Sequence, residues 1–268
     1  MKKAILLAGA LTVAMAALTA CGGTGKVEPE TTAEAATKAQ TVTIAAAASL
    51  ETCLRDELIP LFEKQNPGIT IEGTYDSSGK LQTQIEEGAG IDVFFSAAAK
   101  QMDALNEKGM IQDGSVRNLL ENKIVFIVPT GDEGNYSSFE DIAKAENAAL
   151  GDPDSVPAGQ YSKEALTNLG LWDEVLAKAS LGTNVTEVLN WVAEGSAKAG
   201  IVYATDAAQT GKVTIVAEAP EGSVKKAIYP AGIIKDCENP EGAQKFIDFL
   251  TSSEAMDIFV KNGFAAAE

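Results

Sequence analysis

Short runs of β-branched and aliphatic residues alternate along the chain with segments in which apolar residues recur every three or four positions. The runs predict strands, and the segments with a repeat near 3.6 residues predict helices. From residue 41 to residue 109 the predicted order is strand, helix, strand, helix, strand, helix. This alternation is typical of an α/β protein whose sheets are mainly parallel and flanked by helices.

The run Ile124-Val125-Phe126-Ile127-Val128 is continuous and apolar, as expected for a strand buried on both faces. A Gly-rich polar stretch at 131–137 follows and predicts a boundary between two lobes. We predict further strands at residues 41–45, 69–75, 92–96, 199–203, 213–217 and 227–234. We predict helices at 80–87, 99–108, 138–143, 161–169, 186–193, 240–250 and 253–262, and a first helix with the apolar stripe Leu50, Leu54, Leu58 and Leu61, kinked at Pro60.

The N-terminus has the layout of an export signal. Met1-Lys2-Lys3 is basic, and the apolar stretch at 4–17 that follows is too short to span a bilayer as a stable helix. We therefore predict that residues 1–20 are a signal peptide and that the mature protein is exported. Residues 21–40 lack a large aliphatic or aromatic cluster that could offset the entropy of ordering, so we predict a disordered tether.

Composition removes several classes of function. The 268 residues include no histidine, which excludes Ser-His and Cys-His nucleophile pairs and histidine-ligated metal sites. The net charge of −17 gives no basic field for a phosphate backbone, so nucleic acid is not an expected partner. Three cysteines are too few for a four-thiolate zinc site. Cys53 lies on a predicted apolar helix face and is expected to be a buried thiol, but the sequence leaves its pairing with Cys237 open.

Small polar residues occur at four points where a predicted helix begins. Ser49 follows the first strand at an N-cap position, and Asp76-Ser77-Ser78-Gly79 follows the second strand. Residues 156–159 and 182–185 precede two later helices. Each helix start offers unpaired N–H groups and the positive end of a macrodipole, which suits an anion bound without Lys or Arg. Routine helix capping explains the same residues, so this pattern alone leaves both interpretations open.

Five stretches of the chain carry a family resemblance. They are Ala46-Ala47-Ala48-Ser49-Leu50, Ser77-Ser78-Gly79, Gly90-Ile91-Asp92-Val93-Phe94, the run from Gly151-Asp152-Pro153 through Val156-Pro157-Ala158-Gly159-Gln160-Tyr161, and Gly200-Ile201-Val202-Tyr203. From Thr41 to Phe264 the chain resembles the periplasmic molybdate-binding proteins of molybdate ABC importers, and the run at 151–161 is the most specific part. Leu18-Thr19-Ala20-Cys21 also resembles the bacterial lipoprotein box, in which the cysteine becomes the lipidated first residue of the mature protein.

The resemblance implies a two-lobed, periplasmic-binding-protein-like α/β fold, with residues 41–125 and 206–268 in one lobe and 126–205 in the other. In this family a tetrahedral oxyanion sits between the lobes and is held by neutral donors, with no cofactor and no metal beyond the molybdenum of the ion. The implied donors are the hydroxyls and amides of Ser49 and Ser78, the amides of Ala158 and Val185, and the hydroxyl of Tyr203. Val185 is placed by its helix context. Gly79 departs from the pattern, because some relatives have a third serine there that would supply a secondary donor.

The resemblance also implies a function. The chain would be an exported lipoprotein, not an enzyme, that captures molybdate or tungstate and delivers it to a membrane permease. It would act as a monomer, anchored to the outer face of the cytoplasmic membrane by a lipid on Cys21. The alternatives are a binder of sulfate or of a metal chelate, a surface adhesion module, and a secreted hydrolase with Ser49 or Ser78 as nucleophile. The hydrolase conflicts with the lack of histidine and of a Gly-x-Ser-x-Gly motif around either serine.

Overall fold

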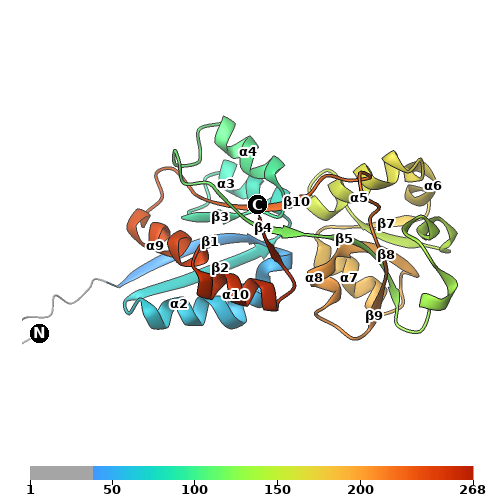
Figure 1. The fold of residues 1–268 in the computed structure, drawn as a ribbon. Helices are drawn as coiled ribbons and strands as arrows, with labels where there is room; N and C mark the ends of the chain where they lie inside the picture. The colour runs from blue at the N-terminus through green and yellow to red at the C-terminus, as the bar shows by residue number, and fades with distance from the viewer. Residues whose placement is uncertain (1–38, 268) are drawn as a thin grey trace, which may run out of the picture. The chain divides into compact units, whose positions relative to one another are not determined.

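The computed structural model describes residues 39–267, in which two β-sheets are each flanked by helices (Figure 1). The expected signal peptide at 1–20, Cys21 and nearly all of the expected tether at 21–40 lie outside the described residues. Gln40, the last residue of the expected tether, is instead the first residue of a strand, where its amide donates to the carbonyl of Gly68. Among the described residues, no helix combines the length and the apolar character needed to cross a bilayer.

The first sheet has the strand order β11-β4-β10-β3-β1-β2. Its strands are β1 Gln40–Ala47, β2 Ile69–Asp76, β3 Val93–Phe95, β4 Arg117–Asn122, β10 Ala227–Ile233 and β11 Ala265–Ala266. β1 pairs in parallel with both β2 and β3, and β10 pairs antiparallel with β3 and β4. The four residues at the end of β1 are buried, so the loop that follows starts from a fixed point in the core.

The helices of this lobe are α1 Glu51–Cys53, α2 Ile59–Gln65, α3 Ser78–Glu86, α4 Ala99–Glu107, α9 Pro240–Leu250 and α10 Ser253–Lys261. A π turn at Leu54–Leu58 separates α1 from α2, and Pro60 is the second residue of α2. In a regular α-helix the proline ring would clash with the carbonyl four residues earlier, and proline has no amide to donate. The wider π turn relieves that clash. The sequence predicted the irregularity at Pro60, and the helix continues through it to Gln65.

The second sheet has the strand order β7-β6-β8-β5-β9. Its strands are β5 Ile124–Pro129, β6 Ala148–Gly151, β7 Ala179–Gly182, β8 Ala199–Tyr203 and β9 Val213–Glu218. β6 pairs in parallel with β7 and β8, whereas β5 pairs antiparallel with β8 and β9. The helices of this lobe are α5 Pro157–Asn168, α6 Trp172–Leu176, α7 Val185–Ala193 and α8 Ala204–Ala207.

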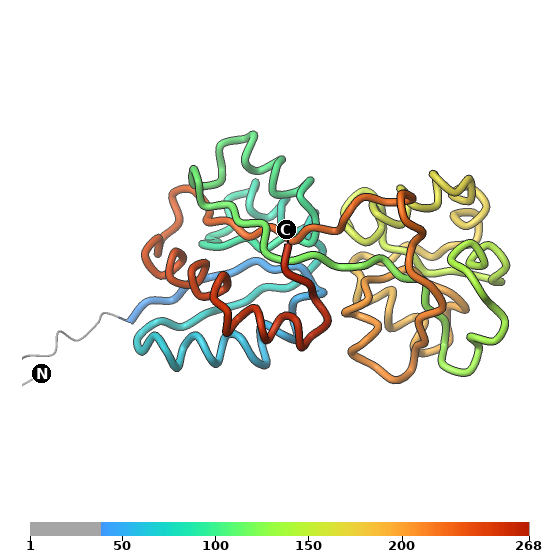
Figure 2. Tube along the Cα trace, viewed as in Figure 1, coloured from blue at the N-terminus to red at the C-terminus, as the bar shows by residue number. Residues whose placement is uncertain are grey.

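The two-lobed α/β architecture is confirmed, but the expectation of mainly parallel sheets is wrong. Both sheets are mixed, because the strands that enter each lobe from the other, β5 and β10, run against their neighbours. Figure 2 traces the two crossings, between β4 and β5 and between β9 and β10. β5 already begins at Ile124, and β9 pairs with β5, so the chain returns to the first sheet after Glu218 and not after residue 205.

Apolar burial follows the sequence pattern closely. The residues from Ile124 to Val128 are buried, as predicted for a strand covered on both faces. Cys53 is also buried, and its thiol donates to the carbonyl of Leu50 over 3.3 Å. Burial raises the pKa of this thiol to about 12, so it stays protonated at neutral pH. Cys53 and Cys237 are both free thiols, which answers the question of their pairing that the sequence left open.

Candidate functional site

A small cavity lies where the two lobes face each other. The first lobe lines it with Ala47, Ala48, Ser49, Asp76, Ser77, Ser78 and Ala97, and the second lobe with Val156, Pro157, Ala158, Val185 and Tyr203. All five donors implied by the family resemblance are therefore brought to one place. The volume of the cavity is about 10 Å³, roughly room for one water-sized group and far below the roughly 300–1,000 Å³ of sites for drug-sized ligands. The cavity suits a small ligand.

Each donor is positioned where a strand ends. Ser49 follows β1, Ser78 begins α3 after β2, and Tyr203 is the last residue of β8. Ala158 and Val185 lie at the starts of α5 and α7, which follow β6 and β7. Within each lobe most of these strands run parallel, so their carboxyl ends meet at one edge of the sheet. The loops at these edges build the cavity.

Ser49 lies inside a 3-10 turn, Ala48–Leu50, and is not the N-cap that the sequence predicted. Its hydroxyl is 3.0 Å from the hydroxyl of Tyr229, which in turn accepts a hydrogen bond from the Asn122 side-chain amide over 3.2 Å. Either hydroxyl of this pair can donate, and in one arrangement Tyr229 accepts from Asn122 and donates its own proton to Ser49. The Ser49 proton then remains for a ligand.

Tyr229 was missed by the sequence analysis. It is fully buried, and burial raises its pKa well above the usual value, so the hydroxyl stays protonated and can orient Ser49. No local sequence signal marks it, because the contact joins β10 to a turn 180 residues earlier in the chain.

Ser78 also has its acceptor side engaged. The amide of Ala97 donates to the Ser78 hydroxyl oxygen over 3.0 Å, which leaves the hydroxyl proton for the cavity. The neighbouring Ser77 is 3% exposed, lines the same cavity, and its hydroxyl oxygen has no hydrogen-bond partner among residues 39–267. An unpaired buried hydroxyl is costly, so it points to a further ligand contact. The sequence placed Ser77 in this polar cluster but did not assign it as a donor.

Backbone amides complete the site at the starts of α5 and α7. Pro157 has no N–H group, so Ala158 supplies an early free amide of α5. Asn184 caps α7 by accepting from the Glu187 amide over 3.0 Å, which leaves the Val185 amide outside the capping interaction. These two helices and α3 have twelve, nine and nine residues. Each directs the positive end of its dipole, about half an elementary charge, toward the cavity.

Tyr203 is the donor whose proton is already in use. Its hydroxyl donates to the Ala97 carbonyl across the two lobes, over 3.2 Å. Burial raises its pKa well above the usual value, so the hydroxyl remains a donor at neutral pH. To donate to a ligand it must release Ala97. Its ring packs edge-on against Tyr229, with 5.4 Å between ring centroids, which holds the hydroxyl at the cavity.

The lining of this cavity contains no Lys or Arg, and its single charged residue is Asp76. The Asp76 carboxylate accepts from the Ser77 amide over 2.7 Å and lies 3.3 Å from the Lys80 ammonium.

Within the part of the chain that the structure describes, no group of three or more Cys, Asp or Glu residues could hold a metal ion. The Ser49 hydroxyl contacts Tyr229, whose raised pKa keeps it protonated, and the Ser78 hydroxyl contacts a backbone amide, so neither partner can act as a general base. The arrangement can bind an anion through neutral donors.

Residues 42–265 match the bacterial extracellular solute-binding proteins. The chain belongs to this family. As a solute-binding protein it is not an enzyme, so the hydrolase alternative falls. The expected fold and class of function are thereby confirmed, and the roles of the individual site residues stay predictions.

Relatives of this solute-binding protein agree with the resemblance seen in its sequence. The putative ABC transporter substrate-binding lipoprotein YvgL of Bacillus subtilis strain 168 is 44% identical over 229 residues, which cover 85% of this chain and 88% of that protein. The molybdate-binding protein ModA of Haemophilus influenzae is 39% identical over 233 residues, which cover 84% of this chain and 90% of that protein.

Solved structures show the same relationship. The substrate-binding domain of a putative molybdenum ABC transporter from Clostridium difficile has a TM-score of 0.67 and is 34% identical to this chain. The match covers 85% of this chain and 100% of that one. The periplasmic molybdate-binding protein of Azotobacter vinelandii has a TM-score of 0.75 at 24% identity, and the match covers 85% of this chain and 100% of that one. The two proteins share a fold.

Proposed function

We propose that this solute-binding protein captures molybdate outside the cytoplasm and delivers it to the membrane permease of an ABC importer. One observation carries the proposal: donors from both lobes converge on one small cavity without any cationic side chain. A tetrahedral dianion there would bridge the lobes and stabilise their closed arrangement by its higher affinity for it. The names of the molybdate-binding relatives support this choice of ligand.

The chemistry of the cavity favours an ion without a proton. A fully deprotonated dianion such as molybdate or tungstate offers only acceptors, which match the hydroxyl and amide donors. A protonated phosphate would need an acceptor for its P–OH group. The one carboxylate of the cavity, Asp76, is already engaged by the Ser77 amide and Lys80. This argument disfavours phosphate but fits sulfate as well as molybdate and tungstate, and the names of the molybdate-binding relatives support the choice of molybdate.

The remaining parts of the proposal concern the setting. We infer that residues 1–20 are removed on export, that a lipid on Cys21 holds the protein at the outer face of the cytoplasmic membrane, and that it works as a monomer. The lipoprotein name of the Bacillus subtilis relative and the lipoprotein box at residues 18–21 support the anchor.

Calorimetric titration with molybdate, sulfate and phosphate tests the function. We expect tight binding of molybdate, weaker binding of sulfate in competition, and no measurable binding of phosphate. At 100 times its dissociation constant, molybdate should also add about 2.7 kcal/mol to the free energy of unfolding. Equal affinity for sulfate would point to the other oxyanion binder, and the absence of binding by any of the three would refute the proposal.

Ser78→Ala should weaken molybdate binding by about 1.5–3 kcal/mol, the contribution of a hydrogen bond to a charged acceptor. The variant removes the hydroxyl proton that faces the cavity and also leaves the Ala97 amide without its partner. Titration calorimetry measures the loss. Ser196→Ala, at an exposed serine of the same protein, is the matched control and should bind as the wild type does. Unchanged affinity in Ser78→Ala would remove this hydroxyl from the site.

A further inference from the structure

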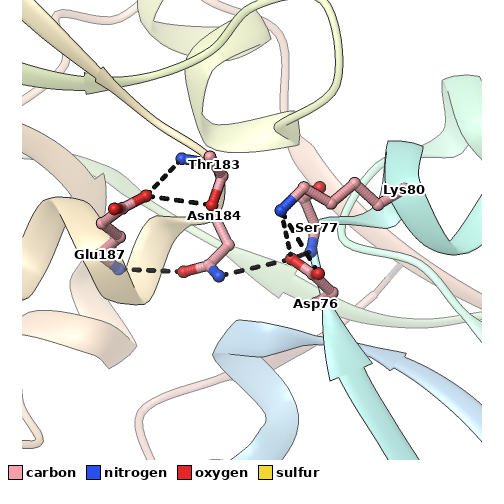
Figure 3. A network of polar contacts seen from close by, with 6 residues as sticks. All are labelled: Asp76, Ser77, Lys80, Thr183, Asn184 and Glu187. Atoms are coloured by element: carbon pink, nitrogen blue, oxygen red, sulfur yellow. Dashed lines mark hydrogen bonds and ion pairs between the residues drawn. The ribbon is translucent and has the colours of Figure 1, made fainter.

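A polar network joins the two lobes beside the cavity (Figure 3). Asn184 of the second lobe uses both ends of its side-chain amide. Its oxygen accepts from the Glu187 amide and caps α7, and its nitrogen donates to the Asp76 carboxylate of the first lobe over 3.4 Å. Glu187 in turn accepts from the amide and hydroxyl of Thr183, which fixes the loop that carries Asn184.

The Asp76 carboxylate receives these contacts at the end of β2. The same oxygen that accepts from Asn184 also accepts from the Ser77 amide over 2.7 Å, at the start of α3. One carboxylate oxygen therefore touches the beginnings of two helices in different lobes. Those helices carry Ser78 and Val185, which both line the cavity. The contact fixes one donor-bearing segment relative to the other.

Charge alone gives no reason for an acid at this place. Asp76 lines the cavity, and a carboxylate beside a bound dianion is repulsive. Lys80 lies 3.3 Å away and offsets part of that charge, but its side chain is 38% exposed and solvent screens the pair. If Asp76 affected the anion only by charge repulsion, removal of the carboxylate would tighten anion binding. A role in holding the lobes together predicts the opposite result.

A second contact between the lobes lies close by and provides an independent reporter. The amide of Gly79, in the first turn of α3, donates to the Ser155 carbonyl of the second lobe over 2.9 Å. An amide in the first turn of a helix has no partner within the helix. Exchange of the Gly79 amide proton with solvent therefore reports whether the lobes are in contact at this point.

We propose that Asp76 and Asn184 form a latch between the lobes that holds the closed arrangement and slows the release of the bound anion. Asp76 and Asn184 are positioning residues in this role, because they act through the segments that carry Ser78 and Val185. The effect on anion release rests on the proposed function. The latch itself does not, since it can be read from the protein without any ligand.

Three variants isolate the latch. Asp76→Ala and Asp76→Asn both remove the charge, but only Asn keeps an oxygen that can accept from Asn184. Asn184→Ser keeps a capping oxygen for α7, since serine is a good N-cap residue, but is too short to reach Asp76. Thermal melts of all three variants establish that they are folded. Asn184→Ser leaves α3 unchanged, but the loop that carries Asn184 also contacts Asp152, whose carbonyl accepts from the Ser155 amide, so the double variant is needed to assign a change at Gly79 to Asp76.

The first readout is exchange of the Gly79 amide proton, followed by NMR in the full chain without added ligand. We expect exchange to become about three- to tenfold faster in Asp76→Ala and in Asn184→Ser, as for the loss of one modest hydrogen bond. Exchange of the Gly79 amide proton in the double variant should be no faster than in either single variant. The same proton should exchange more slowly in Asp76→Asn than in Asp76→Ala. Equal exchange in the wild type and in Asn184→Ser would overturn the latch, as would additive effects in the double variant.

The second readout is the rate of molybdate release, measured by stopped-flow fluorescence. Release should be faster from Asp76→Ala than from Asp76→Asn, although both have lost the same charge. Equal release rates and equal affinities in Asp76→Ala and Asp76→Asn would show that the acid acts only through its charge and would also overturn the latch. A wild-type protein that does not bind molybdate would instead refute the proposed function, and the exchange measurement would still decide for or against the latch.

Discussion

Gly79→Ala should weaken molybdate binding by about tenfold or more and should also loosen the contact between the lobes in the free protein. A Cβ atom at this position would lie 2.4 Å from the Ser155 carbonyl oxygen and 2.7 Å from its Cα. These are backbone atoms of the other lobe and cannot turn aside as a flexible side chain would. Overpacking of this kind costs about 1–3 kcal/mol, and about 1.4 kcal/mol corresponds to tenfold.

Two effects of Gly79→Ala on the free protein oppose each other. The clash exists only where the lobes are in contact. Within α3, alanine is favoured over glycine by about 0.5–1 kcal/mol, which benefits the protein whether the lobes touch or not. From the family pattern Gly79 is expected to lack a secondary donor, and the structure adds a steric reason for glycine at this position.

Calorimetry with molybdate and thermal melts without ligand check the prediction for Gly79. Gly90→Ala is the matched control, since no atom lies within 4 Å of a Cβ at that position and its backbone conformation is open to any residue. Wild-type affinity in Gly79→Ala would mean that the close approach to Ser155 is not needed for binding.

Asp206→Asn should stabilise the protein at pH 8 by roughly 4 kcal/mol and have little effect near pH 4. Asp206 is 2% exposed, and its carboxylate accepts from the Tyr203 amide over 3.2 Å. Burial raises the pKa of this carboxyl from 3.8 to about 7, and the hydrogen bond from Tyr203 lowers it by less. Asparagine keeps an oxygen for the Tyr203 amide but carries no charge.

The sign of the pH dependence follows from the raised pKa. Between about pH 4 and pH 7 the folded protein holds a proton on Asp206 that the unfolded chain has lost. The free energy of unfolding therefore falls as the pH rises through this window, by about 1.4 kcal/mol for each pKa unit. Below about pH 4 and above about pH 7, Asp206 does not change the free energy of unfolding as the pH changes. The wild type should lose stability across it relative to Asp206→Asn.

Urea unfolding at pH 4.5 and pH 8 measures the difference between the wild type and Asp206→Asn. Asp257→Asn, at an exposed aspartate of α10, is the control for loss of a carboxylate in an already acidic chain. If Asp206→Asn changed the free energy of unfolding equally at both pH values, the carboxyl would not be the buried, proton-holding group that the structure indicates.

The sequence predicted those elements whose residues carry a strong local pattern. The buried run of β5 and the amphipathic helices α9 and α10 were found near their observed bounds. The strands β4, β6, β7 and β11 were missed, because their sequences have neither alternation nor many β-branched residues. They are strands because their neighbours in the sheets pair with them. The mixed order of the sheets follows from the crossings between the lobes, which no local pattern encodes.

The candidate site was predictable where a donor follows a strand or begins a helix. Ser49, Ser78 and Tyr203 stand next to such boundaries, and the family resemblance connected them. Tyr229 and Asp76 could not be assigned in this way. Tyr229 contacts Ser49, which is 180 residues away in the sequence, and Asp76 contacts Asn184, which is 108 residues away. Only the folded chain brings these partners together.

The central claim is that neutral donors from both lobes hold a doubly negative tetrahedral ion inside an acidic protein. Anomalous diffraction at the molybdenum absorption edge, from crystals grown with molybdate, tests it most directly. We predict one strong peak in the cavity, with oxygens in hydrogen-bond reach of Ser49, Ser78, Tyr203 and the amides of Ala158 and Val185. A peak outside this cavity, or one held by a lysine or arginine nitrogen, would contradict the claim.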